Sequence, residues 1–204
     1  MPSSFPYNLM PFDRSIADVQ QWTNYIWFLL IAFWLGTWIF IKRPAFRPSL
    51  NVRLEHSAVV GVGLYLLFGH LALPAPLNLQ LFNVTIPIAL LGAFIVAIGV
   101  GLAIWGRLIL GSNWSAVAEI KEHHELVRTG PYRFMRHPIY EGFVVALAGS
   151  AIQRGAVCSA LGVLVCFWGL QMKIEVEERL LVHRFGEQYR AYQRLVSALP
   201  PFLP

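Results

Sequence analysis

The sequence predicts an all-α integral membrane protein with about five transmembrane helices. Its 204 residues are 56% hydrophobic and only 13% charged, and the mean hydropathy is +0.55. A soluble domain carries roughly 25% charged residues. The apolar residues also fall in long uncharged runs, as membrane spans do. We therefore expect one membrane domain over residues 1–204, with three spans in 1–110 and two more spans plus a helical tail in 111–204.

Three uncharged runs mark the N-terminal spans. Residues 22–41 carry no charge and are long enough as a helix to cross about 30 Å of hydrocarbon. No small-residue cleavage pattern follows this run, so we expect a retained span rather than a signal peptide. Residues 57–73 and 84–105 predict the second and third spans. Three glycines of the third run offer places for close helix contact: Gly92, Gly99 and Gly101.

The C-terminal half contains two apolar runs that are shorter than the first and third. Residues 142–152 and 156–172 predict a fourth and a fifth span, joined by a polar tripeptide. Because the fourth run is short, we expect its helix to begin near Pro138, to tilt, or not to cross fully. Proline is tolerated in a first helical turn. Residues 173–185 then show helical periodicity, and Gly186 is expected to end or kink that helix.

The basic residues predict the orientation of these spans. Fourteen of the 16 Lys and Arg residues fall in three segments, 42–55, 106–141 and the tail from 173. Five crossings place all three segments on one side, which the positive-inside tendency makes cytoplasmic, with the N-terminus outside. In a prokaryote this membrane would be the plasma membrane. Because the basic residues follow the topology instead of clustering on a soluble face, we expect no nucleic-acid partner.

The connection 106–141 is too long for a simple turn between helices, and connections of this length are usually functional or disordered. It opens with a turn-like cluster at 111–115 and continues with an alternating, extended stretch at 116–121. Gly130-Pro131 is a further turn signal. Since this connection and the tail lie on the same side, we expect them to form one cytoplasmic pocket.

The tail carries the carboxylate that best suits such a pocket. Lys173 and Glu177 lie one turn apart on the same helix face. Glu175 and Arg179 pair on another face, which contributes only a few tenths of a kcal/mol when exposed. We therefore expect Glu177 to point inward. The alternative is an interfacial carboxylate that Lys173 simply neutralises.

For the remaining histidines and cysteines we expect no catalytic or metal-binding role. His123-His124 resembles half a metal site, but no Cys/His or His-Glu-x-x-His spacing accompanies it, so no metal is expected. His70, in mid-span, is expected to make an interhelical hydrogen bond rather than to act as a relay. Cys158 and Cys166 fall inside an apolar run, which disfavours a disulfide framework.

Several motifs follow one another in the C-terminal half: G-S-N-W-S, H-E-L-V-R-T-G-P-Y, R-H-P-I-Y, and E-E-R-L-L with F-G-E-Q-Y-x2-Y. In this order, with a two-span hairpin between them, they resemble the membrane-embedded methyltransferase family typified by isoprenylcysteine carboxyl methyltransferase. The resemblance covers roughly residues 111–201. It implies a methyltransferase that uses S-adenosyl-L-methionine on a lipophilic or lipidated acceptor, by carboxyl O-methylation of an isoprenylcysteine-like substrate.

The resemblance also implies a cofactor pocket without a Rossmann sheet. Carried over by position, its contacts are Glu119, His124, Glu125, Leu126, Val127, Tyr132, His137, Pro138, Ile139, Tyr140 and Glu177. Glu119 falls near a family glutamine, in an alignment that needs a gap. Where the family has an arginine that is thought to orient the substrate carboxylate, this chain has Lys173, which we take as the catalytic residue. Lysine offers a point charge in place of a planar fork.

The sequence is compatible with other functions. A carboxylate acceptor needs a cation and partial desolvation rather than a general base, whereas an amine acceptor must lose a proton to a carboxylate or to His137. Phospholipid amine N-methylation is therefore the alternative. A membrane reductase using NADPH would need a denser cluster of cationic side chains to bind the phosphates of the dinucleotide. A non-enzymatic scaffold or small transporter would place ionisable residues in mid-span, where only His70 occurs. The sequence leaves the oligomeric state open.

Overall fold

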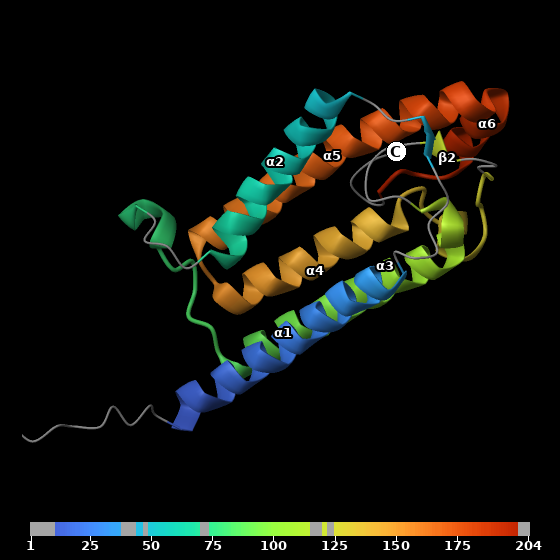
Figure 1. The fold of residues 1–204 in the computed structure, drawn as a ribbon. Coiled ribbons are helices and arrows are strands. Elements are labelled where there is room, and N and C mark those ends of the chain that lie inside the picture. The colour runs from blue at the N-terminus through green and yellow to red at the C-terminus, as the bar shows by residue number, and fades with distance from the viewer. Residues whose placement is uncertain are drawn as a thin grey trace, which may run out of the picture.

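The computed structural model describes residues 11–37, 44–46, 49–69, 74–114, 120–121 and 125–199. They form a bundle of long helices that run back and forth along one direction (Figure 1). The α-helices are α1 Pro11–Thr37, α2 Leu50–Phe68, α3 Ile86–Leu110, α4 Pro138–Arg154, α5 Val157–Phe185 and α6 Glu187–Leu195. Three short 3₁₀ helices join them: η2 Ala75–Asn78, η3 Gly111–Asn113 and η4 Gly130–Arg133. Two short strands, β1 Pro44–Phe46 and β2 Ile120–Lys121, pair antiparallel.

The small β-ladder is a departure from the all-α prediction. The extended stretch expected at 116–121 is a strand at Ile120–Lys121, and its other residues lie outside the described ranges. Its partner strand, Pro44–Phe46, has no alternating pattern in the sequence. The two segments are far apart in the chain, and no local pattern in the sequence predicts their pairing.

The helices begin and end differently from the uncharged runs. α1 begins at Pro11 and α2 at Leu50, well before the predicted spans, because each helix continues into polar turns beyond its apolar part. α2 also ends early, at Phe68, where Gly69 is extended. The predicted end of the first span, at residue 41, lies outside the described residues.

In the C-terminal half, the helix bounds agree better with the predictions. α4 begins at Pro138, as expected, and has 17 residues. The fifth run and the tail helix form one continuous helix, α5, whose apolar part ends at Met172. Gly186 ends α5 with a φ of 56°, a backbone conformation that favours glycine. The prediction of a helix end at Gly186 is therefore confirmed.

Glycines bring α3 and α4 into close contact. A Cβ placed on Gly99 would lie 2.5 Å from the carbonyl oxygen of Gly142, and one on Gly92 would lie 2.7 Å from that of Gly149. Real side chains do not approach a backbone this closely, so only glycine permits the packing. The prediction of close contact is confirmed for Gly92 and Gly99. It is wrong for Gly101, where a Cβ would meet nothing within 4 Å.

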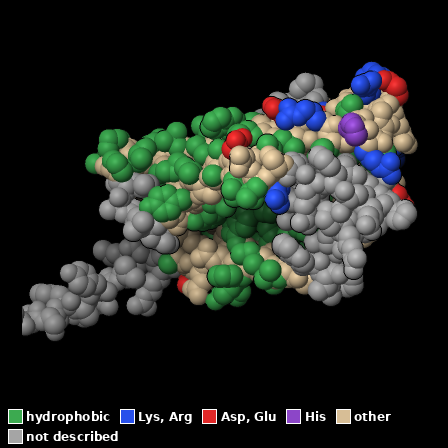
Figure 2. Space-filling model, turned by 45° about the horizontal axis from the view of Figure 1, so that its top comes forward, with side chains coloured by type: hydrophobic (Ala, Val, Ile, Leu, Met, Phe, Trp, Pro, Cys, Tyr) green, Lys and Arg blue, Asp and Glu red, His purple; other side chains and the backbone are tan. Residues whose placement is uncertain are grey.

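Large apolar side chains cover the outward faces of the bundle. Phe28, Phe94 and Trp168 are each more than 60% exposed. Figure 2 shows such side chains spread over most of one face, with charged side chains gathered near one end. A soluble bundle does not leave so much apolar surface in water. Among the described residues, α3 together with η3, and α5, are long and apolar enough to cross a membrane. The count of five spans stays a prediction.

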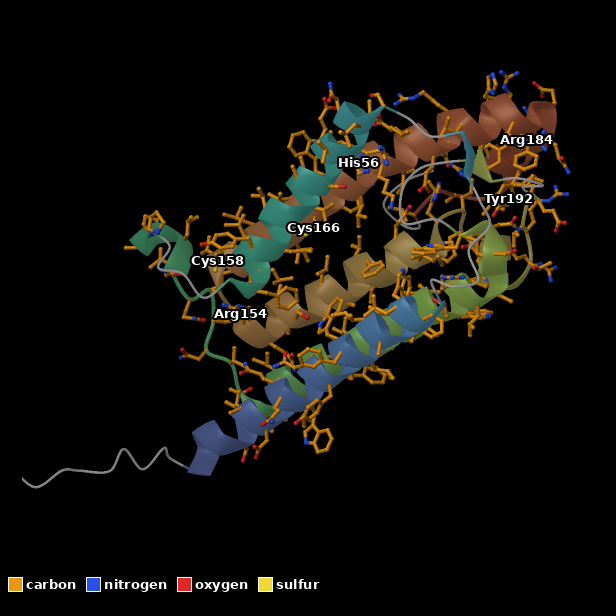
Figure 3. The ribbon with its side chains drawn as sticks, in the orientation of Figure 1. His56, Arg154, Cys158, Cys166, Arg184 and Tyr192 are labelled. Atoms are coloured by element: carbon orange, nitrogen blue, oxygen red, sulfur yellow. The ribbon has the colours of Figure 1, made fainter. Side chains whose placement is uncertain are left out.

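Polar contacts hold each end of the bundle. At one end, Arg107 Nη2 donates to the carbonyl oxygen of Thr37 at 3.0 Å and Nη1 to that of Gly111 at 2.7 Å. This cation joins the C-terminal ends of α1 and α3, where helix dipoles favour positive charge. At the opposite end, where Figure 3 shows Arg154 and Cys158, Gln153 Nε2 donates to the Thr23 hydroxyl at 3.0 Å.

Candidate functional site

A cavity of about 780 Å³, its open mouth included, lies at the polar end of the bundle. Its walls come from the C-terminal end of α3, residues 125–127, η4, the first turn of α4, the polar half of α5, and α6. Most of the residues expected to bind a cofactor line it: Glu125, Leu126, Val127, Tyr132, His137, Ile139, Tyr140 and Glu177. The fold therefore brings together side chains from the connection 106–141 and from the tail.

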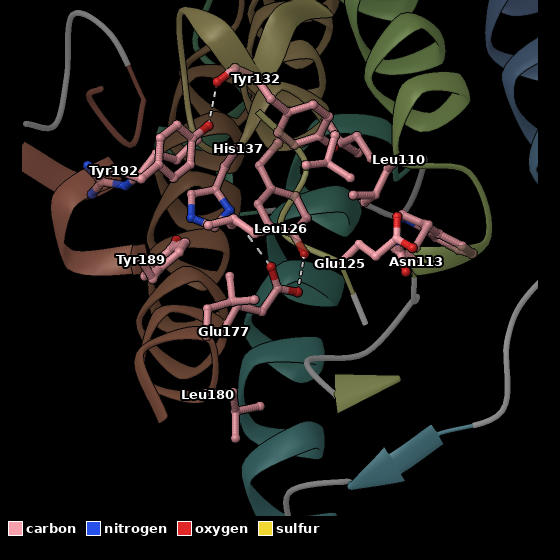
Figure 4. A pocket seen from close by; sticks show the side chains of 16 residues that line it. Leu110, Asn113, Glu125, Leu126, Tyr132, His137, Glu177, Leu180, Tyr189 and Tyr192 are labelled. Atoms are coloured by element: carbon pink, nitrogen blue, oxygen red, sulfur yellow. Dashed lines mark hydrogen bonds and ion pairs between the residues drawn. The ribbon is translucent and has the colours of Figure 1, made fainter. Parts of the chain in front are cut away.

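Glu177 points into this cavity, as the helical spacing predicts. The Tyr140 hydroxyl donates to Glu177 Oε1 at 2.5 Å, and His137 Nδ1 lies 3.8 Å from Oε2 (Figure 4). The rings of His137 and Tyr140 stack with centroids 5.7 Å apart and 15° between their planes. The carboxylate is thus held by His137, just before α4, and by Tyr140 in its first turn. Its other lone pairs remain available for a ligand in the cavity.

Glu178, the next residue, accepts hydrogen bonds from several side chains beside the cavity. Its carboxylate accepts from Arg136 Nε at 2.7 Å, from His137 Nε2 at 3.0 Å, from Gln193 Nε2 at 2.6 Å and from the Tyr189 hydroxyl at 3.3 Å. Glu178 of α5 therefore links Arg136 and His137, which precede α4, with helix α6. Such charge-assisted hydrogen bonds are about twice as strong as neutral ones.

These contacts change the acidity of Glu178. Burial alone would raise the pKa of this carboxyl group, but hydrogen bonds from His137 and Arg136 outweigh that effect and lower the pKa to about 2. Glu178 is therefore ionised at neutral pH.

α6 closes the cavity with two tyrosines one turn apart. The Tyr192 hydroxyl donates to the carbonyl oxygen of Tyr132, and the Tyr132 hydroxyl donates to that of Gly106 at 3.4 Å. Burial raises the pKa of Tyr132 and Tyr189 above the usual range, and that of Tyr192 to about 12. All three hydroxyls therefore remain protonated donors at neutral pH.

Lys173 lies beside this cavity and does not line it. Its Nζ is 4.9 Å from the centre of the Tyr140 ring, a cation–π contact. Lys173 lines instead a second, larger hollow of about 2030 Å³, open side included. Tyr140 lines both spaces, so the two adjoin at this residue.

The second hollow is an apolar groove between α1 and α2, with α4 and α5 as its floor (Figures 1 and 2). We call it the apolar groove. Its lining is Asn24, Trp27, Phe28, Leu30, Ile31, Trp34 and Leu35 of α1, Val60, Leu64, Tyr65 and Phe68 of α2, Gly69, and Tyr140, Phe143, Leu147, Cys166, Leu170 and Lys173 of α4 and α5. Lys173 is the one charged side chain in this described lining.

Some predicted residues lie elsewhere. Pro138 is fully buried and packs close to Gly106 of α3, so it starts α4 without lining the cavity. Glu119 and His124 lie outside the described residues, as do His123 and His70.

Sequence reasoning missed other residues of the cavity. They are Leu110, Asn113, Trp114, Arg136, Leu180, Leu181, Tyr189 and Tyr192. Tyr189 and Tyr192 had a readable signal, because they lie at i and i+3 in a short amphipathic helix and share one face. Glu178 had none, because its partners Arg136 and His137 lie 42 and 41 residues away in the chain.

Comparison with known proteins gives consistent results. Residues 88–183 match the model of the isoprenylcysteine carboxyl methyltransferase (ICMT) family. Protein-S-isoprenylcysteine O-methyltransferase B of Arabidopsis thaliana is 34% identical over 96 residues, covering 46% of this chain and 49% of that protein. The A form of the same plant is 38% identical over 84 residues, covering 41% and 43%. The Xenopus laevis protein-S-isoprenylcysteine O-methyltransferase is 30% identical over 119 residues, covering 57% and 41%.

The fold is also shared with a solved structure. The eukaryotic intramembrane Ras methyltransferase ICMT superposes with a TM-score of 0.53 at 22% sequence identity, covering 78% of this chain and 55% of that one. The chain spans about half the length of the curated relatives it matches. The matched residues contain the whole lining of the cavity except Tyr189 and Tyr192 of α6.

Proposed function

We propose that the protein methylates the carboxylate of a lipidated, isoprenylcysteine-like acceptor with S-adenosyl-L-methionine, as the match of residues 88–183 to the isoprenylcysteine carboxyl methyltransferase family suggests. The observation that carries the proposal is the position of Tyr140. The cavity with its carboxylates and the apolar groove meet at this ring, with Lys173 on the groove side. A water-soluble donor and a lipid-soluble acceptor would thus meet beside one residue.

The cavity suits S-adenosyl-L-methionine by its chemistry. A sulfonium and an ammonium group favour a nearby carboxylate and aromatic faces, which Glu177, Tyr140 and Trp114 provide. Leu126, Val127 and Ile139 offer an apolar surface to an adenine ring. Glu177 and Glu125 bring two carboxylates to the lining. A positively charged ligand would therefore find a complementary site.

A dinucleotide would fit less well. Its phosphates require cationic side chains or a helix N-terminus that is free to bind them. Arg136 is the only Lys or Arg in the described lining, and it already bonds to Glu178 and to the carbonyl oxygens of Gln193 and Val196. This arrangement favours the methyl donor over NADPH.

The groove and Lys173 suit a lipidated acid. The apolar lining would take the isoprenyl chain, and the ammonium group of Lys173 would hold the carboxylate beside Tyr140. The positive charge of Lys173 disfavours an amine acceptor, because it repels a protonated amine. A carboxylate is therefore the better acceptor than a phospholipid amine.

The protein's part in the reaction is positioning. When bound, the donor supplies a methyl group that leaves its sulfonium sulfur for an acceptor oxygen, which gives a methyl ester and a neutral thioether. Lys173 would fix the carboxylate, and Tyr140, which lines both spaces, would hold the carboxylate next to the methyl group of the donor. Glu177 would orient the donor's cationic part. Alignment of this kind can contribute several kcal/mol to lowering the barrier.

The same proposal gives the protein an orientation. The cavity, α6 and the charged side chains near Arg184 and Tyr192 gather at one end of the bundle (Figure 3). The positive-inside tendency favours the cytoplasm for this end. A cytoplasmic cavity would meet the donor where it is made.

The decisive experiment compares two ligands on detergent-solubilised protein. S-adenosyl-L-methionine should raise the thermal unfolding midpoint and NADPH should not, since only the former matches the charge of the cavity. Labelled donor should then transfer its methyl group to an N-acetylated S-farnesyl cysteine and produce a base-labile ester. Stabilisation by NADPH alone, or no labelled ester, would contradict the proposal.

A matched pair of variants tests the site itself. Glu177→Gln should weaken donor binding measured by calorimetry, because it removes the negative charge from the cavity. Glu175→Gln is the control, since Glu175 is exposed and pairs with Arg179 at 4.0 Å on a face of α5 away from the cavity lining. Equal affinity in both variants would remove Glu177 from the cofactor site.

A further inference from the structure

A buried histidine lies on the face of α2 that packs against α5. His56 is only 3% exposed. It shares this face with Val60, Gly63 and Leu67, which follow it at helical spacing. The other three residues are apolar or glycine, as suits the close packing of helices in a membrane. Packing alone therefore does not account for an imidazole in this row.

The register of the two helices places His56 opposite Lys173. α2 and α5 run antiparallel side by side, and a Cβ on Gly169 of α5 would lie 3.0 Å from the backbone nitrogen of Val60 (Figure 1). His56 comes one turn before Val60, and Lys173 comes one turn after Gly169. His56 and Lys173 therefore occupy the next level of the same helix interface.

The imidazole of His56 is oriented by its own helix. One ring nitrogen donates to the carbonyl oxygen of Val52, one turn earlier. A neutral imidazole has one donor nitrogen and one acceptor nitrogen, so the other nitrogen carries a lone pair. Such a lone pair is the kind of polar partner that makes the burial of an ammonium group less costly.

Charged groups of both helices act on this ring: Lys173 and Glu177 of α5, and Glu55 of α2. His56 precedes the predicted second span. Burial and then the positive charge of Lys173 lower the pKa of His56, and they outweigh the two carboxylates and the hydrogen bond to Val52. The ring is therefore neutral at pH 7. The influence of Lys173 on it agrees with the helix register.

The lysine side chain needs such surroundings to be held in one place. Its ammonium group is a point charge on a flexible four-carbon stem. Tyr140 of α4 presents a ring face to it, with 4.9 Å from Nζ to the ring centre. His56 adds a neutral imidazole from α2. Two helices besides α5 therefore border the cation that lines the apolar groove.

We propose that His56 is a positioning residue for Lys173: its neutral imidazole keeps the ammonium group at the end of the groove where the acceptor carboxylate would lie. This inference rests on the proposed function, in which Lys173 holds that carboxylate. His56 lines neither the cavity nor the groove, so it acts through Lys173 and not on the reacting atoms.

The first test compares two replacements of His56 at pH 7.5, with labelled donor and N-acetylated S-farnesyl cysteine. His56→Leu should lower kcat, counted per donor-binding site, by about tenfold, the scale on which supporting residues act. Donor affinity measured by calorimetry should not change. His56→Gln should restore most of kcat, because an amide carries both a donor and an acceptor.

Val59→Ala is the matched control for packing. Val59 is partly buried in the same interface, where a Cβ on Gly169 would lie 3.1 Å from its Cγ1, and it does not line the groove. This variant should keep the wild-type kcat although it loosens the contact between α2 and α5. A loss equal to that of His56→Leu would reduce His56 to a packing residue.

A double-mutant cycle shows whether His56 acts through Lys173. In a Lys173→Ala background, His56→Leu should cause no further loss of kcat, because the group that it positions is gone. A further loss of about tenfold would mean that the two residues act independently, which would overturn the proposal.

A further measurement does not need activity. ¹⁵N NMR should show that the pKa of His56 rises in Lys173→Ala, since the repelling charge is removed, and His56→Gln would identify its signals. An unchanged titration would overturn the proposal.

The outcomes separate the two proposals. If wild type forms no ester, the proposed function fails, and with it the carboxylate that Lys173 would hold. If ester forms and His56→Leu keeps the wild-type kcat, or His56→Gln is as impaired as His56→Leu, the role of His56 is overturned and the proposed function stands.

Discussion

His137 Nε2 lies 3.0 Å from Glu178 Oε1, and this contact decides which nitrogen His137 turns toward the cavity. An ionised carboxylate only accepts hydrogen bonds, so the proton must lie on Nε2. Nδ1 is left facing Glu177 at 3.8 Å. Glu178 thus positions a cavity residue without lining the cavity itself.

Glu178→Gln should weaken donor binding by about tenfold or more, since supporting residues of a binding site typically contribute on that scale. The amide NH₂ group of the glutamine would face Arg136 or His137, which are themselves hydrogen-bond donors. Calorimetry would measure the affinity, and ¹⁵N NMR of His137 would show loss of the fixed Nε2 proton. Unchanged affinity with an unchanged ring spectrum would leave Glu178 with a purely structural role.

Acid should remove the stabilisation that Glu178 provides. Its pKa is about 2 in the folded protein, against about 4.3 for an unperturbed glutamate. A lowered folded-state pKa means that the contribution is complete above about pH 4.5 and is lost as the pH falls toward 2. The difference in thermal midpoint between wild type and Glu178→Gln should therefore shrink over this window. A difference that stays constant between pH 5 and 2.5 would argue against the lowered pKa.

Lys173→Ala should lower turnover by about 100-fold, or ~3 kcal/mol of barrier, and should weaken donor binding much less. The physical reason is that Lys173 lines the groove and not the cavity. Lys173→Arg keeps the charge and should retain most activity. Steady-state kinetics and calorimetry on the same preparations would separate the effects. A larger loss of donor affinity than of turnover would move Lys173 to the cofactor site.

Gly99→Ala should lower stability by about 1–3 kcal/mol, because its methyl group would overlap the backbone of α4. The ideal Cβ would lie 2.5 Å from the Gly142 carbonyl oxygen. Gly101→Ala is a control in the same helix, two residues away, where nothing lies within 4 Å. Thermal unfolding in detergent should show a lower midpoint for the first variant only. Equal midpoints would mean that α3 and α4 can separate at little cost.

The sequence predicted what is local or periodic. Glu177 was found because helical spacing places it one turn after Lys173, and the start of α4 because proline marks first turns. Glycine identity could not distinguish Gly99 from Gly101, since only the neighbouring helix decides which of them is crowded. Glu178 and the β1–β2 pair depend on partners far along the chain, and no spacing rule reports such contacts.

The place of Tyr140 in both linings has a kinetic consequence. The cavity and the apolar groove share this residue but are otherwise lined by different side chains. Donor and acceptor would therefore use separate entrances, and neither would have to leave before the other could bind. We expect initial-rate plots for the two substrates to intersect, and the ester product to compete with the acceptor but not with the donor. Once esterified, the acceptor no longer carries the charge that Lys173 holds, so its return to the lipid would be favoured.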